Sequence, residues 1–138
     1  MPEYRLLVVE DNQGIAAMIC RAARDIGFDA RQATGCDAMQ VYQEMQPHIL
    51  ILDILMPEMD GLEFLQFLEE SQSSTRIIIL SGSSDIYRRI AEDQARARGL
   101  KVECNLAKPF RISEVRMLLE NMAKTLSASS SVGAFSHG

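Results

Sequence analysis

Five short apolar runs alternate with amphipathic stretches along most of the chain, and this alternation is the feature that most constrains the fold. The runs cover residues 6–9, 28–33, 49–52, 77–80 and 102–107. Three of them, 6–9, 49–52 and 77–80, are apolar throughout, which is typical of strands buried on both faces of a parallel sheet. The run at 28–33 alternates polar and apolar residues, which favours an edge strand.

The stretches between the runs carry apolar residues at spacings of three and four, as amphipathic helices do. Asn12 is suited to cap the first helix and Gly27 to end it. The stretch at 85–98 is charge-rich, with only a thin apolar stripe. Strict alternation of strands and helices over five units implies a parallel sheet with helices on both faces, joined by right-handed crossovers.

Composition and length limit the classes of protein that this chain fits. With 138 residues, it is long enough for one domain that buries roughly two-thirds of its unfolded surface. We expect that domain to span residues 1–126, and residues 127–138, which are rich in serine and lack periodicity, to form a flexible tail or linker stub. The net charge of −5 argues against direct nucleic-acid binding. No apolar run approaches the ~20 residues of a membrane span.

Three cysteines, Cys20, Cys36 and Cys104, lie far apart in the sequence. An odd number at such spacings forms neither a disulfide framework nor a metal-binding pair. We interpret them as free thiols in a reducing compartment, and we expect the protein to be cytoplasmic.

Chemically active side chains follow four of the predicted strands. In doubly wound sheets the ligand site lies at the carboxyl ends of the strands. Glu10 and Asp11 follow the first run, Asp53 the third, Ser81 the fourth and Lys108 the fifth. The fold should therefore bring three carboxylates, one hydroxyl and one ammonium group into a single pocket.

This set of groups is suited to phosphoryl transfer. Three neighbouring carboxylates repel one another unless a cation is present. Mg²⁺ is the natural cation, because it takes one or two carboxylates together with phosphate oxygens and water. A carboxylate can also act as a nucleophile and form an aspartyl-phosphate. In such reactions positioning and charge neutralisation supply most of the catalysis.

The segment from Asp53 to Gly61, with the sequence DILMPEMDG, resembles the phosphorylation loop of the response-regulator receiver family. The likeness extends from Tyr4 to about Leu126 and is to the chemotaxis-regulator type of receiver. It implies a flavodoxin-like, doubly wound, five-stranded parallel sheet with the strand order 2-1-3-4-5.

The same resemblance assigns roles to the residues at the strand ends. Asp53 is the expected phospho-acceptor, Ser81 the switch hydroxyl, and Lys108 the partner of Asp53 or of the phosphoryl group. The Lys108–Pro109 peptide bond is expected to be cis. The expected Mg²⁺ ligands are Asp11 directly, Glu10 through water, Asp53, and the backbone carbonyl of Leu55.

The resemblance implies a signalling switch of a two-component system rather than an enzyme acting on other substrates. It would catalyse only its own phosphorylation and dephosphorylation. The expected partners are a histidine kinase or phosphotransfer protein and a downstream effector. A fused output domain and a homodimer are left open, and no membrane partner is expected. The face around the fourth helix, fifth strand and fifth helix is expected to change on phosphorylation.

The sequence departs from the family pattern in two places. Asn105 stands three residues before Lys108, where the family usually carries Tyr or Phe. The stretch from Ser81 to Lys108 is also longer than usual, which lengthens the fourth helix or its exit. The segment from Ser81 to Phe110 loosely resembles receivers attached to cyclic-dinucleotide phosphodiesterase domains.

Two alternative functions fit the residues less well. A haloacid-dehalogenase-like phosphatase also uses an aspartate nucleophile and Mg²⁺, but it needs a second Asp two residues later, where this chain has Leu55. A flavodoxin-like FMN carrier needs a phosphate-binding loop after the first strand. Here that loop begins with Glu10 and Asp11, which would repel the cofactor phosphate.

Overall fold

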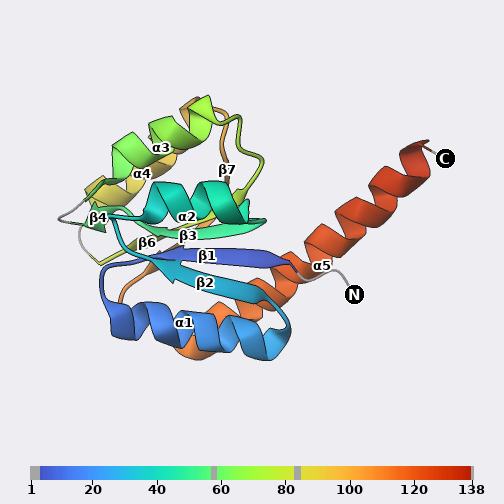
Figure 1. The fold of residues 1–138 in the computed structure, drawn as a ribbon, viewed down its shortest axis with the longest axis horizontal. Helices are drawn as coiled ribbons and strands as arrows, with labels where there is room; N and C mark the ends of the chain where they lie inside the picture. Colours follow the sequence, from blue (N-terminus) through green and yellow to red (C-terminus); the bar gives the residue numbers. More distant parts are fainter. Residues whose placement is uncertain (1–3, 57–58, 83–84, 138) are drawn as a thin grey trace.

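The computed structural model describes residues 4–56, 59–82 and 85–137, and it shows a parallel sheet between two layers of helices (Figure 1). Within these residues the sheet has five strands in the order β2-β1-β3-β6-β7, the predicted 2-1-3-4-5 order. The strands are β1 (Arg5–Val9), β2 (Asp29–Ala33), β3 (Ile49–Asp53), β6 (Arg76–Ser81) and β7 (Lys101–Ala107). The fold expected from the alternation is confirmed.

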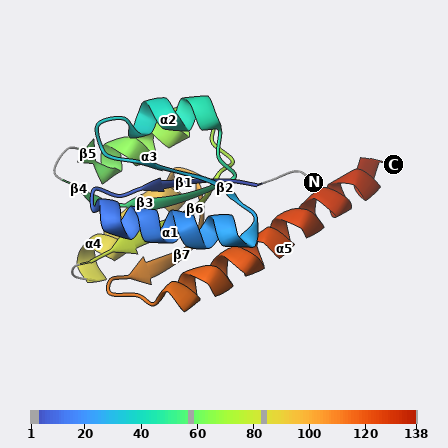
Figure 2. The same ribbon diagram turned by 60° about the horizontal axis from the view of Figure 1, so that its bottom comes forward.

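Helices cover both faces of this sheet. They are α1 (Gln13–Ile26), α2 (Ala38–Met45), α3 (Gly61–Glu70), α4 (Asp85–Ala97) and α5 (Ile112–His137). Helices α1 and α5 lie on one face, and α2, α3 and α4 lie on the other (Figures 1 and 2). A two-stranded antiparallel sheet of β4 (Leu55–Met56) and β5 (Met59–Asp60) precedes α3 and was not foreseen from the sequence.

Alternate residues of the central strands enter two separate cores. In β1, Leu7 and Val9 pack with α2, α3 and α4, whereas Leu6 and Val8 pack with α1 and α5. All four are fully buried. Because successive side chains of a strand point to opposite faces, a central strand between two helical layers must be apolar at every position. This is the physical reason for the continuous apolar runs.

Helix α1 begins and ends where the sequence predicts. Asn12 Oδ1 accepts a hydrogen bond of 3.0 Å from the backbone N–H of Ile15, which satisfies one of the unpaired donors of the first turn. Gly27 closes the helix with a φ of 110°, a left-handed conformation that suits glycine. The start of α1 is thereby fixed directly after Glu10 and Asp11.

The chain beyond Leu126 differs from the expectation of a flexible tail, because α5 continues to His137 as one helix of 26 residues. The helix extends beyond the sheet (Figure 2). No proline interrupts the segment, and serine and alanine are both compatible with a helix. The helix was not foreseen from composition, and the role of residues 127–138 as a flexible tail or linker stub stays a prediction. None of the helices in the described ranges is long and apolar enough to cross a membrane.

His48 joins β1 to β3 at the amino ends of the strands. The side-chain Nδ1 of His48 accepts a 2.9 Å hydrogen bond from the backbone N–H of Arg5, and the backbone N–H of His48 donates to the Arg5 carbonyl at 2.9 Å. Burial lowers the pKa of the imidazole, and the nearby Arg5 guanidinium lowers it further. Because Nδ1 must be unprotonated to accept this bond, the folded state favours neutral His48.

This pKa shift predicts a pH-dependent stability. Since the pKa of His48 is lower in the folded than in the unfolded state, its stabilising effect is present above the unfolded pKa, about 6.5, and is lost as the pH falls through the folded pKa. Urea unfolding should therefore show that His48→Asn, whose amide oxygen can also accept from Arg5, loses less stability than wild type between pH 7.5 and 5. Parallel pH profiles for the two proteins would contradict this account.

Candidate functional site

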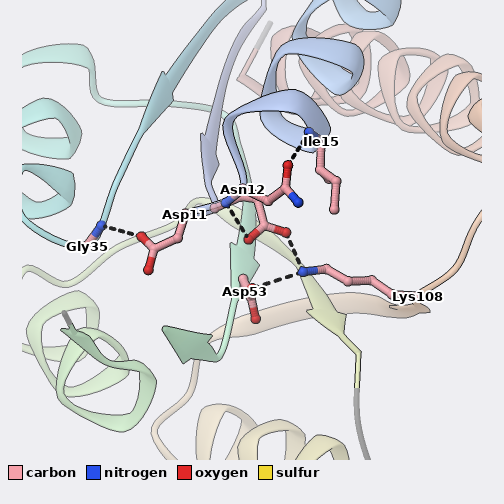
Figure 3. Close-up of polar contacts among 7 residues, drawn as sticks. Asp11, Asn12, Ile15, Gly35, Asp53 and Lys108 are labelled. Atoms are coloured by element: carbon pink, nitrogen blue, oxygen red, sulfur yellow. Dashed lines mark hydrogen bonds and ion pairs between the residues drawn. The ribbon is translucent and has the colours of Figure 1, made fainter. Parts of the chain in front are cut away.

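The carboxyl ends of β1, β3, β6 and β7 place four of the predicted site residues at one edge of the sheet. Figure 3 shows two of them, Asp53 and Lys108, side by side. Glu10 directly follows β1, Asp53 ends β3, Ser81 ends β6, and Lys108 directly follows β7. Parallel pairing aligns these ends, because Asp53 is opposite Leu80 and Ser81 is opposite Ala107. The strand-end rule therefore predicted these positions correctly.

Lys108 lies between two buried carboxylates. Its Nζ is 3.0 Å from Asp53 Oδ2 and also forms an ion pair with Glu10 Oε1. Glu10 is 2% exposed and Asp53 is 5% exposed, so water screens their mutual repulsion poorly. The ammonium group supplies the positive charge that makes this pair of carboxylates tolerable inside the protein.

The pKa values of Glu10 and Lys108 reflect this arrangement. Burial raises the pKa of the Glu10 carboxyl and the neighbouring Asp53 raises it further, while Lys108 opposes both effects. Burial also disfavours the charge on Lys108, but its contacts with Glu10 and Asp53 outweigh burial and raise the pKa of the ammonium group. The site therefore has carboxylate charge in excess and one firmly protonated lysine.

Two backbone features position the Lys108 side chain. Its backbone N–H donates a 2.8 Å hydrogen bond to the Ser81 carbonyl, which continues the β6–β7 pairing by one residue. A Cβ atom on Gly82 would lie 3.3 Å from Lys108 Cδ, so the absence of a side chain there leaves room for the lysine. The Lys108–Pro109 peptide bond is cis, as the family resemblance predicted.

Asp11 points away from the other acidic groups (Figure 3). Its Oδ1 accepts a 3.3 Å hydrogen bond from the backbone N–H of Gly35, in the loop after β2. The structure therefore brings Glu10, Asp53 and Lys108 together but leaves Asp11 outside the cluster. Among the described residues, no group of three or more potential ligands is arranged to hold a metal ion. Repulsion from the neighbouring carboxylates and a free backbone donor both favour this orientation.

Ser81 and Leu55 occupy the remaining predicted positions. Ser81 is 2% exposed, and its Oγ has no hydrogen-bond partner within the described part of the chain. Leu55 begins β4, two residues after Asp53, and the role of its carbonyl as a metal ligand stays a prediction. The sequence reasoning missed Gly35 and Gly82. The first follows the end of β2, so the strand-end rule applied to every strand could have found it.

Comparison with known proteins decides the family. The sequence matches the family described as "Response regulator receiver domain" over residues 6–120, which is most of the chain. It is 32% identical to the chemotaxis protein CheY of Listeria monocytogenes over 122 residues, covering 87% of this chain and 98% of that protein. The chain belongs to the response-regulator receiver family. The expectation drawn from the Asp53–Gly61 motif is thereby confirmed.

Other relatives of this receiver have different sizes and roles. The sporulation initiation phosphotransferase F of Bacillus subtilis is 29% identical over 119 residues, covering 84% of this chain and 90% of that protein. The transcriptional regulatory protein PrrA of Mycobacterium bovis is 31% identical over 131 residues, covering 91% of this chain but 54% of that protein. The receiver thus spans about half the length of PrrA.

A solved structure supports the fold independently. The signal receiver domain of a LuxO repressor protein from Vibrio parahaemolyticus superposes with a TM-score of 0.79 at 24% identity, covering 95% of this chain and 98% of that chain. At this level of identity the similarity shows the fold alone. It agrees with the strand order found here.

The ion pairs of Lys108 lead to a stability prediction. Replacing this lysine by Met, of similar length, removes its ion pairs with two buried carboxylates and should lower the free energy of unfolding by ~1–3 kcal/mol. This loss is smaller than the ~3–5 kcal/mol for breaking a fully buried ion pair, because the Lys108 side chain is 22% exposed to water. Adding Asp53→Asn should recover part of the loss, whereas Lys124→Met on the exposed surface of α5 should have little effect. Equal urea midpoints for Lys108→Met and Lys124→Met would refute the prediction.

Proposed function

We propose that this receiver accepts a phosphoryl group on Asp53 from a histidine kinase or a phosphotransfer protein, and that the modified chain acts as a signalling switch. The observation that carries the proposal is the buried Asp53 carboxylate at a strand end, opposed by Lys108 at 3.0 Å. Membership of the receiver family supports it, since receivers are signalling switches rather than classical enzymes.

The residues at the site have complementary roles in this reaction. An Asp53 oxygen attacks the phosphorus atom, the bond from phosphorus to the donor's imidazole nitrogen breaks, and that nitrogen keeps the electron pair. Lys108 remains protonated and offsets the negative charge near the transferring group. Ser81 Oγ, buried beside the strand end and unpaired in the described structure, is suited to donate a hydrogen bond to a phosphoryl oxygen.

Receivers generally use Mg²⁺, and the side chains present here fit that ion. The donors are oxygen atoms, which hard cations prefer, and the pKa of Glu10 is raised by burial among negative groups. Asp11, Asp53, the Leu55 carbonyl and, through water, Glu10 would hold the ion, which would require the Asp11 carboxylate to give up its hydrogen bond with Gly35. When bound, Mg²⁺ would neutralise carboxylate and phosphoryl charge.

An apolar pocket beside the site suits a phosphate donor that is a protein. Its volume is about 430 Å³, and it is lined by Ile15, Met18, Gly82, Lys108, Pro109 and Phe110. Met18 is 41% exposed on α1. Exposed apolar side chains next to a reactive group favour a protein partner, because their burial stabilises the docked complex. This supports a histidine kinase or phosphotransfer protein over a small-molecule donor.

Phosphorylation itself provides the direct test. Incubation with acetyl phosphate and Mg²⁺ should add one phosphoryl group to wild type, as measured by intact-mass spectrometry. Asp53→Asn should show no addition, because an amide is a poor nucleophile and gives no acyl phosphate. Asp25→Asn, at an exposed position of α1, is the matched control and should react normally. Equal labelling of the Asp53 variant would show that the acceptor lies elsewhere.

Metal binding should be visible as a gain in stability. A ligand that binds only the folded protein stabilises it by about 2.7 kcal/mol at a hundredfold excess over its Kd. Mg²⁺ should therefore raise the melting temperature of wild type, and Asp11→Ala should remove most of that rise. Asp37→Ala changes an exposed acidic residue of the neighbouring loop and should keep the rise. An undiminished Mg²⁺ effect in Asp11→Ala would place the ion at another site.

A further inference from the structure

Helix α4 is joined to strand β7 by a polar cluster that the phosphoryl-transfer site does not include. Asn105 Nδ2 in β7 donates to Glu92 Oε2 in α4, and Glu92 Oε1 pairs with Arg96 one turn further along the helix. Arg96 also donates a 3.3 Å hydrogen bond to the carbonyl of Val102 in β7. These contacts connect one face of the helix to two positions of the same strand.

Apolar packing holds α4 less firmly than it holds the central strands. Among the described side chains of this helix, Ala91 and Ala95 are buried, whereas Ile86 and Ile90 are 67% and 44% exposed. Two alanine side chains bury little apolar area, so among the described side chains the polar contacts are a large share of the attachment of α4 to the sheet.

The hydrogen bonding of Asn105 is incomplete in this arrangement. Its Oδ1 is buried and has no partner within the described ranges, although its Nδ2 is bonded to Glu92. A buried acceptor without a donor is unfavourable. The contact with Glu92 therefore satisfies the nitrogen of the amide but leaves its oxygen without a donor. This reduces the free energy that the contact contributes, relative to an arrangement in which Asn105 and Glu92 are apart.

The cluster also lies on the same strand pair as the candidate site. Asn105 is opposite Ile79 in β6, and two residues further along Ser81 is opposite Ala107, which precedes Lys108. Helix α4 begins at Asp85, four residues after Ser81. A displacement of Ser81 toward a phosphoryl group would act on the start of the helix whose middle is held by Asn105.

We propose that the hydrogen bond between Asn105 and Glu92 is a latch that holds α4 in its unphosphorylated position, and that opening this latch favours the phosphorylated state. The proposal rests on phosphorylation at Asp53. If one of two states has an additional contact, removing that contact raises the population of the other state. Here that other state is the one in which Asn105 and Glu92 are apart, and a ligand that binds only this state gains apparent affinity by the same factor.

Substitutions at Asn105 and Glu92 test the latch. Asn105→Asp replaces the donor by a carboxylate that faces Glu92, which should open the latch. In Asn105→Asp, Arg96 could bridge the new carboxylate and Glu92 and so keep the latch closed. Asn105→Ala removes the donor without adding a carboxylate and therefore excludes this bridge. Adding Glu92→Gln to Asn105→Asp restores a donor and an acceptor in exchanged positions. Glu120→Gln, on the exposed surface of α5, is the charge control.

Two measurements report on these variants. Without ligand, amide hydrogen exchange within α4 should be about tenfold faster in Asn105→Asp and Asn105→Ala, and close to wild type in the double variant and the control. With Mg²⁺, the apparent affinity for beryllofluoride, a phosphoryl mimic, should rise about tenfold in the same two variants and return in the double variant. Tenfold corresponds to 1.4 kcal/mol, which is close to the lower limit of about 1.5 kcal/mol for a hydrogen bond to a charged group.

The outcomes separate the latch from the function on which it rests. Unchanged exchange in both single variants would show that the contact does not restrain α4. Faster exchange with unchanged beryllofluoride affinity would show that α4 is not coupled to the site, and either result overturns the proposal. If the proposed function fails, wild type itself will not bind beryllofluoride, whereas a failed latch leaves wild-type binding intact.

Discussion

The ion pairs of Lys108 with Glu10 and Asp53 are the interaction on which the rest of the structure is organised. Two carboxylates that are at most 5% exposed cannot share a strand-end pocket without a cation. The fold supplies that cation from Lys108, which follows β7, two strands away from β3 in the sheet. The strand order that builds the core therefore also brings the lysine to the carboxylates. The carboxylate charge that remains in excess in this pocket is the reason for our proposal that it takes up a further cation together with a phosphoryl group.

The fold could be predicted because its causes are local and repetitive. Residues such as Leu6 to Val9 are apolar at every position since both faces of their strand are covered, and Asn12 and Gly27 mark the ends of α1 by capping. The predicted site residues follow from the strand ends once the sheet is parallel. What sequence could not supply was side-chain orientation: Asp11 follows β1 as predicted, but its carboxylate accepts a hydrogen bond from the backbone of Gly35.

Two other features, the length of α5 and the contact between Glu92 and Asn105, could not be predicted from sequence patterns. The continuation of α5 past Leu126 follows from the absence of a strong stop signal in a serine-rich segment whose composition is equally compatible with disorder. The contact between Glu92 and Asn105 joins residues 13 positions apart on different elements, and nothing in the spacing marks them as partners. Asn105 was recognised as a departure from the family pattern, but its partner was visible only in three dimensions.

The long helix α5 has a geometric consequence for any segment that follows it. A helix of 26 residues is about 39 Å long, and each added residue rotates the end of the chain by about 100° around the helix axis. Because the first half of α5 is packed against α1 and the sheet by residues such as Val115 and Leu119, this packing sets the direction in which the helix leaves the domain. Insertion or deletion of one residue after Leu126 would therefore rotate any segment that follows the helix around the helix axis, without altering the receiver itself. The angular position of such a segment thus depends on the length of the helix and not on phosphorylation.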